Sequence, residues 1–338
     1  MGCILLTGVA GFIGSHLAES LVNSGRPVRG VDSFTDTYSP RQKRDNVAAV
    51  SRSSNLEIVE GDLARDDLHD LLEDVDAVVH LAGEPGVPAS WGTGFATYVE
   101  RNIIATQRLL EAATAAGVSR CVYASSSSIY GPADRPVAES ALPCPLSPYG
   151  ATKLAGEFLV GAYAQQRKLA TVTLRYFSVF GPRQRPDMAA HRFIDALLDH
   201  HPVPIYGDGR QARDFTYVGD VVAATAAALT TSVPAGSVLN IARGEPVEVR
   251  DLIAIIADEL GVEPRIERRP EREGDALRTE GCADAARRVL GWEPGTDLRS
   301  GLRRQIEWHL RRRLELVSPA LGTVAVGAGG ATLRQDVA

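Results

Sequence analysis

The first half of the chain alternates short apolar runs with longer stretches that have helical spacing. Five runs have the length and composition of strands, at residues 3–7, 27–32, 56–63, 75–83 and 120–124. The fourth is apolar almost throughout, which is typical of a strand buried on both faces of a parallel sheet. Helical patterns at 97–116 and 148–168 precede the fifth run and a sixth run at 171–176. This alternation predicts an α/β fold with a doubly wound parallel Rossmann sheet.

The regular alternation of strands and helices ends after residue 176, and we expect a domain boundary there. Residues 1–176 are predicted to form the Rossmann domain, to which the chain returns near 214–242 through a further helix and strand. Residues 177–317 mix short strands with helices, which predicts a smaller mixed α/β C-terminal substrate domain. Residues 318–338 are rich in Gly and Ala, and we expect a flexible tail.

The last helical pattern, at 298–316, has apolar residues four positions apart. We expect Leu302, Ile306, Leu310 and Leu314 to face inward and the arginines between them to form a solvated face.

Charge and composition exclude several classes of partner. The 338 residues carry a net charge of −6 and the pI is about 5.7, so binding to nucleic acid or to an anionic membrane is not indicated. No apolar run has the length of a membrane span. The four cysteines are scattered without metal-ligand spacing, so we expect no bound metal and a reducing compartment, the cytoplasm.

A glycine-rich loop follows the first predicted strand. Gly8, Gly11 and Gly14 form a G-x-x-G-x-x-G pattern that leads into a helix, whose N-terminal N–H groups suit a pyrophosphate. Asp32 ends the second run 18 residues after Gly14, where a carboxylate accepts a hydrogen bond from the adenosine ribose. Because that carboxylate would repel a 2′-phosphate, the pattern favours NAD over NADP. Residues 33–55 are expected to form a loop and a short exposed helix.

A tyrosine and a lysine lie one helical turn apart in the second half of the predicted sheet. Ser147 and Pro148 have the character of an N-cap and a first helical residue, so Tyr149 and Lys153 share one helix face. A tyrosine titrates near pH 10, and an ammonium close by lowers its pKa, which would make Tyr149 a general base. The chain has only three lysines against 33 arginines, so a lysine at this position is unusual.

The histidines are given no role in the chemistry. His80 ends a buried strand and is predicted to be a satisfied core residue, whereas His191, His200 and His201 are expected at the surface.

These motifs resemble those of the extended short-chain dehydrogenase/reductase superfamily, and of its nucleotide-sugar epimerase branch in particular. The resemblance covers roughly residues 3–315, with its landmarks at 7–14, 61–63, 175–177, 207–209 and 213–218. It implies an NAD-dependent enzyme in which Tyr149, Lys153 and Ser126 form the catalytic trio.

The resemblance also implies two sets of binding residues. The set for the cofactor NAD is Gly8, Gly11, Phe12, Ile13, Gly14, Asp32, Asp62, Leu63, Leu81, Ala82, Asn102, Ser125, Tyr149, Lys153 and Tyr176. The set for a UDP-sugar is Ser126, Ser127, Ser128, Tyr149, Ser178, Arg185, Arg192, Tyr206, Arg213 and Arg272. In this assignment Arg213 and Arg272 clamp the pyrophosphate, Tyr206 lies in the uracil-contacting segment, and Arg192 adds a phosphate or ribose contact.

Residues beside the trio restrict which of the family's reactions the chain is expected to catalyse. Related 4,6-dehydratases and decarboxylases carry an acidic residue at one or both of the positions that Ser127 and Ser128 occupy here, so neither water elimination nor decarboxylation has its expected group. Segments 31–38 and 185–189 are similar to those of UDP-glucuronate 4-epimerases. In that assignment Arg185 holds the sugar carboxylate through charge-assisted hydrogen bonds, with help from the hydroxyls of Ser127, Ser128 and Ser178.

The resemblance implies a mechanism and an assembly. Tyr149 takes the proton of the sugar 4-OH while a hydride passes from C4 to NAD⁺; the 4-keto sugar then turns, and the hydride returns to its other face. The helices at 97–116 and 148–168 are similar to those of a four-helix homodimer interface. Three alternatives stay open: a UDP-glucose 4-epimerase, favoured by the absence of an arginine at 86–89, a lyase, and a non-catalytic NAD-binding regulator.

Overall fold

A computed structural model describes residues 2–132, 135–271, 274 and 276–317. Seven strands form one sheet, and every pairing within it is parallel. In the order β3–β2–β1–β4–β5–β6–β10, the strands are Leu56–Glu60, Val28–Asp32, Cys3–Thr7, Val75–His80, Arg120–Ser126, Ala170–Tyr176 and Ser237–Ile241. The predicted doubly wound sheet is therefore confirmed, and its strand order reverses between β1 and β4, where ligands bind in such folds.

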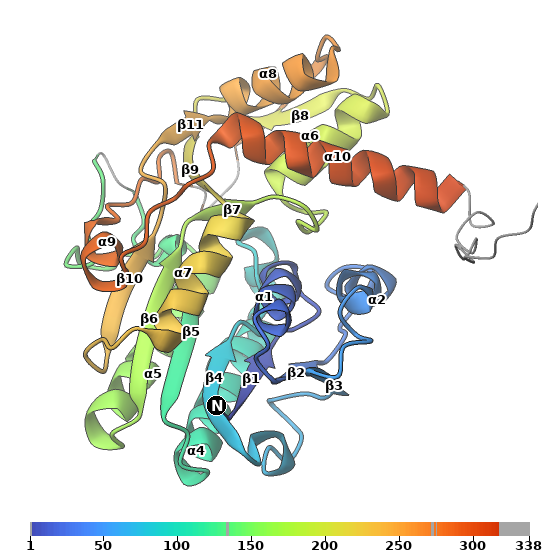
Figure 1. Ribbon diagram of the computed structural model, residues 1–338. Coiled ribbons are helices and arrows are strands. Elements are labelled where there is room, and N and C mark those ends of the chain that lie inside the picture. The colour runs from blue at the N-terminus through green and yellow to red at the C-terminus, as the bar shows by residue number, and fades with distance from the viewer. Residues whose placement is uncertain (1, 133–134, 272–273, 275, 318–338) are drawn as a thin grey trace, which may run out of the picture.

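Helices cover both faces of this sheet (Figure 1). α1 (Phe12–Asn23) and α7 (Val218–Thr230) pack together on one face, and α4 (Ala105–Ala115) and α5 (Pro148–Gln166) on the other. Successive strand residues point to opposite faces, so Val79 joins the core under α1 and α7 while Val78 joins the core under α4 and α5. α2 (Pro40–Ala48) packs beside α1.

The remaining elements form two small sheets and their covering helices. The mixed three-stranded sheet has the order β11–β9–β7, which is Pro246–Glu248, Ala212–Tyr217 and Ser178–Phe180. The second is the parallel pair β8 (Val203–Tyr206) and β12 (Ile266–Arg269). The helices are α6 (Ala189–Leu198), α8 (Val249–Leu260), α9 (Asp284–Leu290) and α10 (Leu298–Val317). The boundaries that we predicted at 176 and 317 stay predictions, and the predicted tail lies outside the described residues.

The helix predicted at 97–116 is built from three pieces. α3 (Phe95–Tyr98), a π-helical segment (Val99–Ile104) and α4 follow one another without a break. The wider π-helical turn lies where Asn102 is buried, between the sheet edge and α5. Shorter 3₁₀ turns occur at Asp70–Leu72, Pro88–Ser90, Gly92–Gly94 and Ser127–Ile129.

Four apolar residues of α10 were predicted to face inward, and the prediction is right for two of them and wrong for the other two. Leu302 and Ile306 are buried, but Leu310 and Leu314 are 44% and 70% exposed. A spacing of four residues rotates about 40° per step around an α-helix, so a stripe at every fourth residue leaves the buried face. The buried face instead continues through Gln305 and His309.

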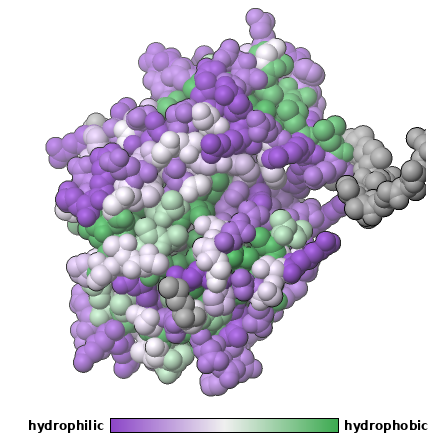
Figure 2. Space-filling model, viewed as in Figure 1, coloured by the Kyte–Doolittle hydropathy of each residue, from purple (hydrophilic) through white to green (hydrophobic). Residues whose placement is uncertain are grey.

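Hydrophobic and hydrophilic residues are unevenly distributed over the surface. In Figure 2 apolar residues gather in a band across the middle of the face and in a second patch at its upper right, and hydrophilic residues cover most of the rest. Among the described residues, no helix combines the length and the apolar character needed to cross a bilayer. All four cysteines are free thiols.

Two contacts join α1 to the loop that follows β7. His16 Nε2 lies 2.9 Å from the backbone oxygen of Pro182, and Arg183 forms an ion pair with Glu19 at 2.5 Å. Burial lowers the pKa of His16 to about 4, so at neutral pH its ring is uncharged and can donate one N–H to the Pro182 carbonyl.

A buried carboxylate fixes the start of β9. Asp214 is fully buried and accepts hydrogen bonds from the backbone N–H groups of Arg243, Gly244 and Gly281 at 3.0, 2.9 and 3.0 Å. These bonds tie β9 to two loops that are distant in sequence.

We expect Asp214→Asn to lower the free energy of unfolding by about 2–4 kcal/mol, because the amide places N–H donors against backbone donors. Urea unfolding followed by circular dichroism measures the change. Asp45→Asn, at an exposed position, is the matched control and should change stability by less than about 0.5 kcal/mol. Equal stability of the two variants would contradict this role for Asp214.

Candidate functional site

A cavity of about 540 Å³ lies at the carboxyl ends of the central strands, and both parts of the chain line it. This volume is in the range of small-molecule sites. The predicted site residues that line it are Gly8, Gly11, Phe12, Ile13, Gly14, Asp32, Asp62, Leu63, Leu81, Ala82, Ser125, Ser126, Ser127, Ser128, Tyr149, Lys153, Tyr176, Ser178, Arg185 and Arg213. The chain therefore folds most of the two predicted sets around one cavity.

The N-terminus of α1 faces this cavity and is suited to an anion. Gly11 caps the helix without a side-chain hydrogen bond, and the first turn has no acidic residue. Gly8 has φ +71°, and a Cβ on Gly14 would lie 2.0 Å from the Gly8 oxygen, so this tight turn needs both glycines. The uncapped N–H groups and the positive end of the helix dipole fit a pyrophosphate.

Asp32 ends β2 at the far side of this loop. Its carboxylate accepts hydrogen bonds from the N–H groups of Ala10 and Phe34 at 3.1 and 2.8 Å. Burial raises its pKa, although Lys43, at 3.9 Å, acts in the opposite direction. Because each carboxylate oxygen can accept more than one bond, Asp32 can still hold a ribose hydroxyl.

We expected the short helix in segment 33–55 to be exposed, and this prediction was wrong for one face of the helix. α2 buries Gln42, Lys43 and Asn46, and Lys43 lines the cavity together with Thr35. Sequence reasoning missed Lys43, although it is one of three lysines in an arginine-rich chain. The same rarity had drawn attention to Lys153.

The predicted trio comes together at the ends of α5 and β5. The Ser147 hydroxyl caps α5 by accepting from the Gly150 N–H at 3.2 Å, so Tyr149 and Lys153 lie in its first two turns and both line the cavity. Ser126, at the end of β5, is near enough to Tyr149 for its hydroxyl to act to lower the pKa of the phenol. The arrangement places a hydroxyl, a phenol and an ammonium around one point of the cavity wall.

We predicted that the pKa of Tyr149 is lowered, and for the protein chain alone this prediction was wrong. Burial raises the pKa of Tyr149, and the hydroxyl of Ser126 and the charge of Arg185 offset this only in part. Burial also lowers the pKa of Lys153 to about 8, although the nearby Glu157 carboxylate acts to raise it. The Lys153 ammonium lies 4.7 Å from the centre of the Tyr123 ring, which adds a cation–π contact.

Glu157, which sequence reasoning missed, supports Lys153 from one turn further along α5. Arg175 donates to its carboxylate from Nε at 3.0 Å and from Nη2 at 2.8 Å, and Ser125 donates to the same group. Arg175 also donates to the hydroxyl of Tyr130 at 2.6 Å. The signal in the sequence was an acidic residue four positions after Lys153 in a largely apolar helix.

The basic side chain proposed for a sugar carboxylate already has a partner. Arg185 forms a two-point ion pair with Asp187, with Nε–Oδ1 at 3.0 Å and Nη2–Oδ2 at 2.8 Å. Asp187 lines the cavity too and was not predicted. Ser127, Ser128 and Ser178 line the same cavity as this guanidinium.

Among the described residues, three of the predicted ones do not line the cavity: Asn102, Arg192 and Tyr206. Asn102 is buried behind the wall, where its amide bonds to the backbone of Glu84 and to Thr152. The Arg192 guanidinium lies 5.9 Å from the centre of the Tyr206 ring, so these two residues contact each other. Arg272 lies outside the described residues.

The histidine predictions were right for three residues and wrong for one. His80 is buried between the hydroxyls of Thr7 and Thr106, at 2.8 and 3.0 Å, as expected of a satisfied core residue. His200 and His201 are exposed. His191 is buried instead, because its ring packs against α10, a contact that the local sequence does not show.

The sequence of the chain is similar to those of several known proteins. A profile of the NAD dependent epimerase/dehydratase family matches residues 4–242. The UDP-glucuronate 4-epimerase of Thermodesulfobacterium geofontis is 36% identical over 323 residues, covering 94% of this chain and 98% of that protein.

Two solved structures resemble the chain closely. UDP-glucuronic acid 4-epimerase from Bacillus cereus, solved with UDP-glucuronic acid and NAD, has a TM-score of 0.90 at 40% identity, over 92% of this chain and 99% of that one. MoeE5 with UDP-glucuronic acid and NAD has a TM-score of 0.84 at 45% identity, over 92% of this chain and 100% of that one. MoeE5 has also been solved with UDP-glucose and NAD.

We expect Lys153→Met to raise the free energy of unfolding at pH 7 by about 1–3 kcal/mol while turnover is lost, because a buried ammonium is replaced by an apolar side chain. Below pH 8 the native lysine is charged at a cost. Between pH 8 and 10.5 the native state has released the proton that the unfolded state still binds, so wild-type stability rises and the difference shrinks.

Denaturant unfolding at pH 7 and at pH 9.5 measures this difference. Lys168→Met, at an exposed lysine, should change neither stability nor turnover. A Lys153→Met variant less stable than wild type would show that the ammonium stabilises the fold.

Proposed function

The chain belongs to the NAD dependent epimerase/dehydratase family, and on that premise we propose that it is an NAD-dependent UDP-glucuronate 4-epimerase. The observation that carries the proposal is one cavity in which Tyr149, Lys153 and Ser126 face Arg185, with hydroxyls at Ser127 and Ser128. Two structural neighbours bind UDP-glucuronic acid together with NAD, which supports the same pairing here.

The nucleotide half of the cavity fits the cofactor. The uncapped N-terminus of α1 would hold the pyrophosphate of NAD, and Asp32 would accept from the adenosine ribose. Lys153 would hold the nicotinamide ribose. When bound, NAD supplies the acceptor, and later the donor, of the hydride at sugar C4.

Residues of the chain transfer and stabilise the proton of the sugar 4-OH. Tyr149 accepts the proton of the sugar 4-OH as that carbon is oxidised, and returns it when the ketone is reduced from its other face. Ser126 donates a hydrogen bond to the same sugar oxygen. Lys153 stabilises the phenolate through its charge, which matters because burial raises the pKa of Tyr149 in the chain by itself.

Arg185 would select the substrate and protect its intermediate. A 4-keto glucuronate is a β-keto acid, which loses CO₂ readily when its carboxylate can turn out of the carbonyl plane. Charge-assisted hydrogen bonds from Arg185, with hydroxyls of Ser127, Ser128 and Ser178, would fix that carboxylate. Asp187 holds the guanidinium fork in place beforehand, so the arginine does not need ordering by the substrate.

A UDP-glucose 4-epimerase is the second candidate. MoeE5, which shares 45% identity with the chain, has also been solved with UDP-glucose, and Pro88 in the cavity wall cannot donate a hydrogen bond to a carboxylate. A lyase would need an acid where Ser127 and Ser128 stand. A regulator that only binds NAD would have no use for a catalytic trio.

Purified protein incubated with each UDP-sugar, without added NAD, separates these functions. UDP-glucuronate should give UDP-galacturonate at a higher kcat/KM than UDP-glucose gives UDP-galactose. A UDP-pentose or a 4-keto sugar as the main product would establish a lyase. No product from either sugar, despite bound NAD, would establish a regulator.

We expect Arg185→Ala to lower kcat/KM for UDP-glucuronate by about 10²–10³-fold, the value of a charge-assisted pair, and UDP-glucose epimerisation by less than about tenfold. Some UDP-pentose should form as the loosened carboxylate leaves. Anion-exchange chromatography of the products measures both. Arg210→Ala, at an exposed arginine, is the control. Equal losses for both sugars would refute the carboxylate assignment.

We also propose that the enzyme is a cytoplasmic homodimer joined by a four-helix bundle. Its free cysteines fit a reducing compartment. α3 and the π-helical segment expose Phe95 and Ile104, and the adjacent α5 exposes Phe158. A second copy of these helices would cover the apolar side chains, which are otherwise costly in water.

We expect Phe158→Asp to convert the dimer into a folded monomer, because a carboxylate would be buried at the twofold contact. Size-exclusion chromatography with light scattering measures the mass. Leu277→Asp, at an equally exposed leucine away from these helices, should leave the dimer intact. A Phe158→Asp chain that remains dimeric would exclude this interface.

A further inference from the structure

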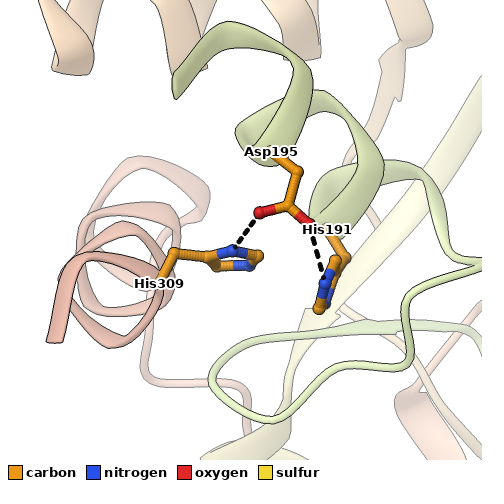
Figure 3. A group of neighbouring side chains, drawn as sticks. All are labelled: His191, Asp195 and His309. Atoms are coloured by element: carbon orange, nitrogen blue, oxygen red, sulfur yellow. Dashed lines mark hydrogen bonds and ion pairs between the residues drawn. The ribbon is translucent and has the colours of Figure 1, made fainter. Parts of the chain in front are cut away.

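Two histidines and an aspartate meet between α6 and α10, outside the cavity described above (Figure 3). His191 and Asp195 lie one turn apart on α6, and His309 reaches them from α10. His191 and His309 are only 5% and 3% exposed. None of the three lines the catalytic cavity, so the proposed epimerase chemistry does not use them.

His191 has an acceptor at each ring nitrogen. Nδ1 lies 2.7 Å from the backbone oxygen of Gln184, so Nδ1 carries a proton and donates it there. Nε2 lies 3.2 Å from Oδ2 of Asp195, a second acceptor. Two acceptors around one ring leave two possibilities: a second proton on Nε2, or a cation between Nε2 and the carboxylate.

His309 uses one of its two ring nitrogens within the cluster and leaves the other without a partner. Its Nδ1 lies 3.0 Å from Oδ1 of Asp195, whereas its Nε2 is buried and has no hydrogen-bond partner among the described residues. Burial lowers the pKa of His309. A buried nitrogen without a partner is costly, and a ligand would remove that cost.

We propose that His191, Asp195 and His309 form a binding site for one divalent transition-metal ion of the zinc type. Neutral imidazoles and a carboxylate are the ligands that such ions prefer. One potential ligand atom from each residue lies within 4.8 Å of the others, so small side-chain rotations bring all three to one ion. The Gln184 carbonyl holds the His191 ring through Nδ1, as second-shell carbonyls do for metal-bound histidines.

Arg313 is the competitor for this site. Its Nη2 lies 3.0 Å from Oδ1 of Asp195, but the same guanidinium also pairs with Asp199 at 2.5 and 3.0 Å. A metal ion would displace it from Asp195 and leave it on Asp199. Removing Arg313 should therefore strengthen metal binding, whereas the same change would only weaken a purely structural ion-pair cluster.

The position of the site gives it a structural effect. α6 follows directly on the loop that carries Arg185, and the Gln184 side chain accepts from the His191 N–H and from Gln305 of α10. An ion held by both helices would join α10 to α6 and to this loop. Metal binding should then raise the melting temperature of the whole chain.

Calorimetric titration of the metal-stripped, full-length chain with Zn²⁺ tests the proposal. We expect one ion per chain and a higher melting temperature. His309→Gln should weaken binding at least tenfold, Arg313→Ala should tighten it several-fold, and the exposed control His201→Gln should change nothing. No saturable binding, or equal binding by wild type and His309→Gln, would overturn the proposal, as would weaker binding by Arg313→Ala.

A second measurement needs no change to the cluster. The Trp308 ring centre lies 4.9 Å from that of His309 and 5.9 Å from that of His191, so paramagnetic Co²⁺ bound here should quench its fluorescence. The quenching should saturate at one equivalent and disappear in Trp308→Phe, which retains Trp91 and Trp292. Quenching that survives in Trp308→Phe would place the ion elsewhere and refute the assignment.

Discussion

The burial of an ammonium at Lys153 is the constraint around which the centre of the molecule is built. A charged group removed from water must be compensated by a nearby opposite charge and by hydrogen bonds. Glu157 supplies the charge, and Arg175 and Ser125 hold Glu157 in place. Through Tyr130 and Asn240 the same set of bonds reaches β10, so the last strand of the sheet is tied to α5, which carries Lys153 and Glu157.

The cavity combines two kinds of recognition that come from different parts of the chain. The central sheet supplies backbone N–H groups and short polar side chains at its carboxyl edge, which suit a nucleotide that stays in one place. The segments after β6 supply Ser178, Arg185 and Arg213, which suit a substrate that must be gripped at its charged ends. A chain with a net charge of −6 thus concentrates guanidinium groups where an anionic ligand would lie.

The sequence was most informative where structure depends on neighbours along the chain. The alternation of strands and helices, the glycine turn before α1 and the Ser147 cap of α5 follow local rules, and the structure agrees with each. Residues whose surroundings come from distant segments were harder to predict. His191 is buried by α10, Arg185 meets Asp187, and Lys43 turns from a polar helix into the cavity. Leu314 shows the same limit, because a periodic pattern alone does not tell where a helix leaves its support.

The contacts of α1 with the loop after β7 have a mechanical consequence. His16 and Glu19 lie on the helix whose first turn faces the cavity, and they hold Pro182 and Arg183, which lie three and two residues before Arg185. These contacts therefore hold α1 and the loop after β7 together on this side of the cavity. Under the proposed function, the wall that would bind the dinucleotide and the wall that would bind the sugar therefore keep a fixed spacing through these contacts.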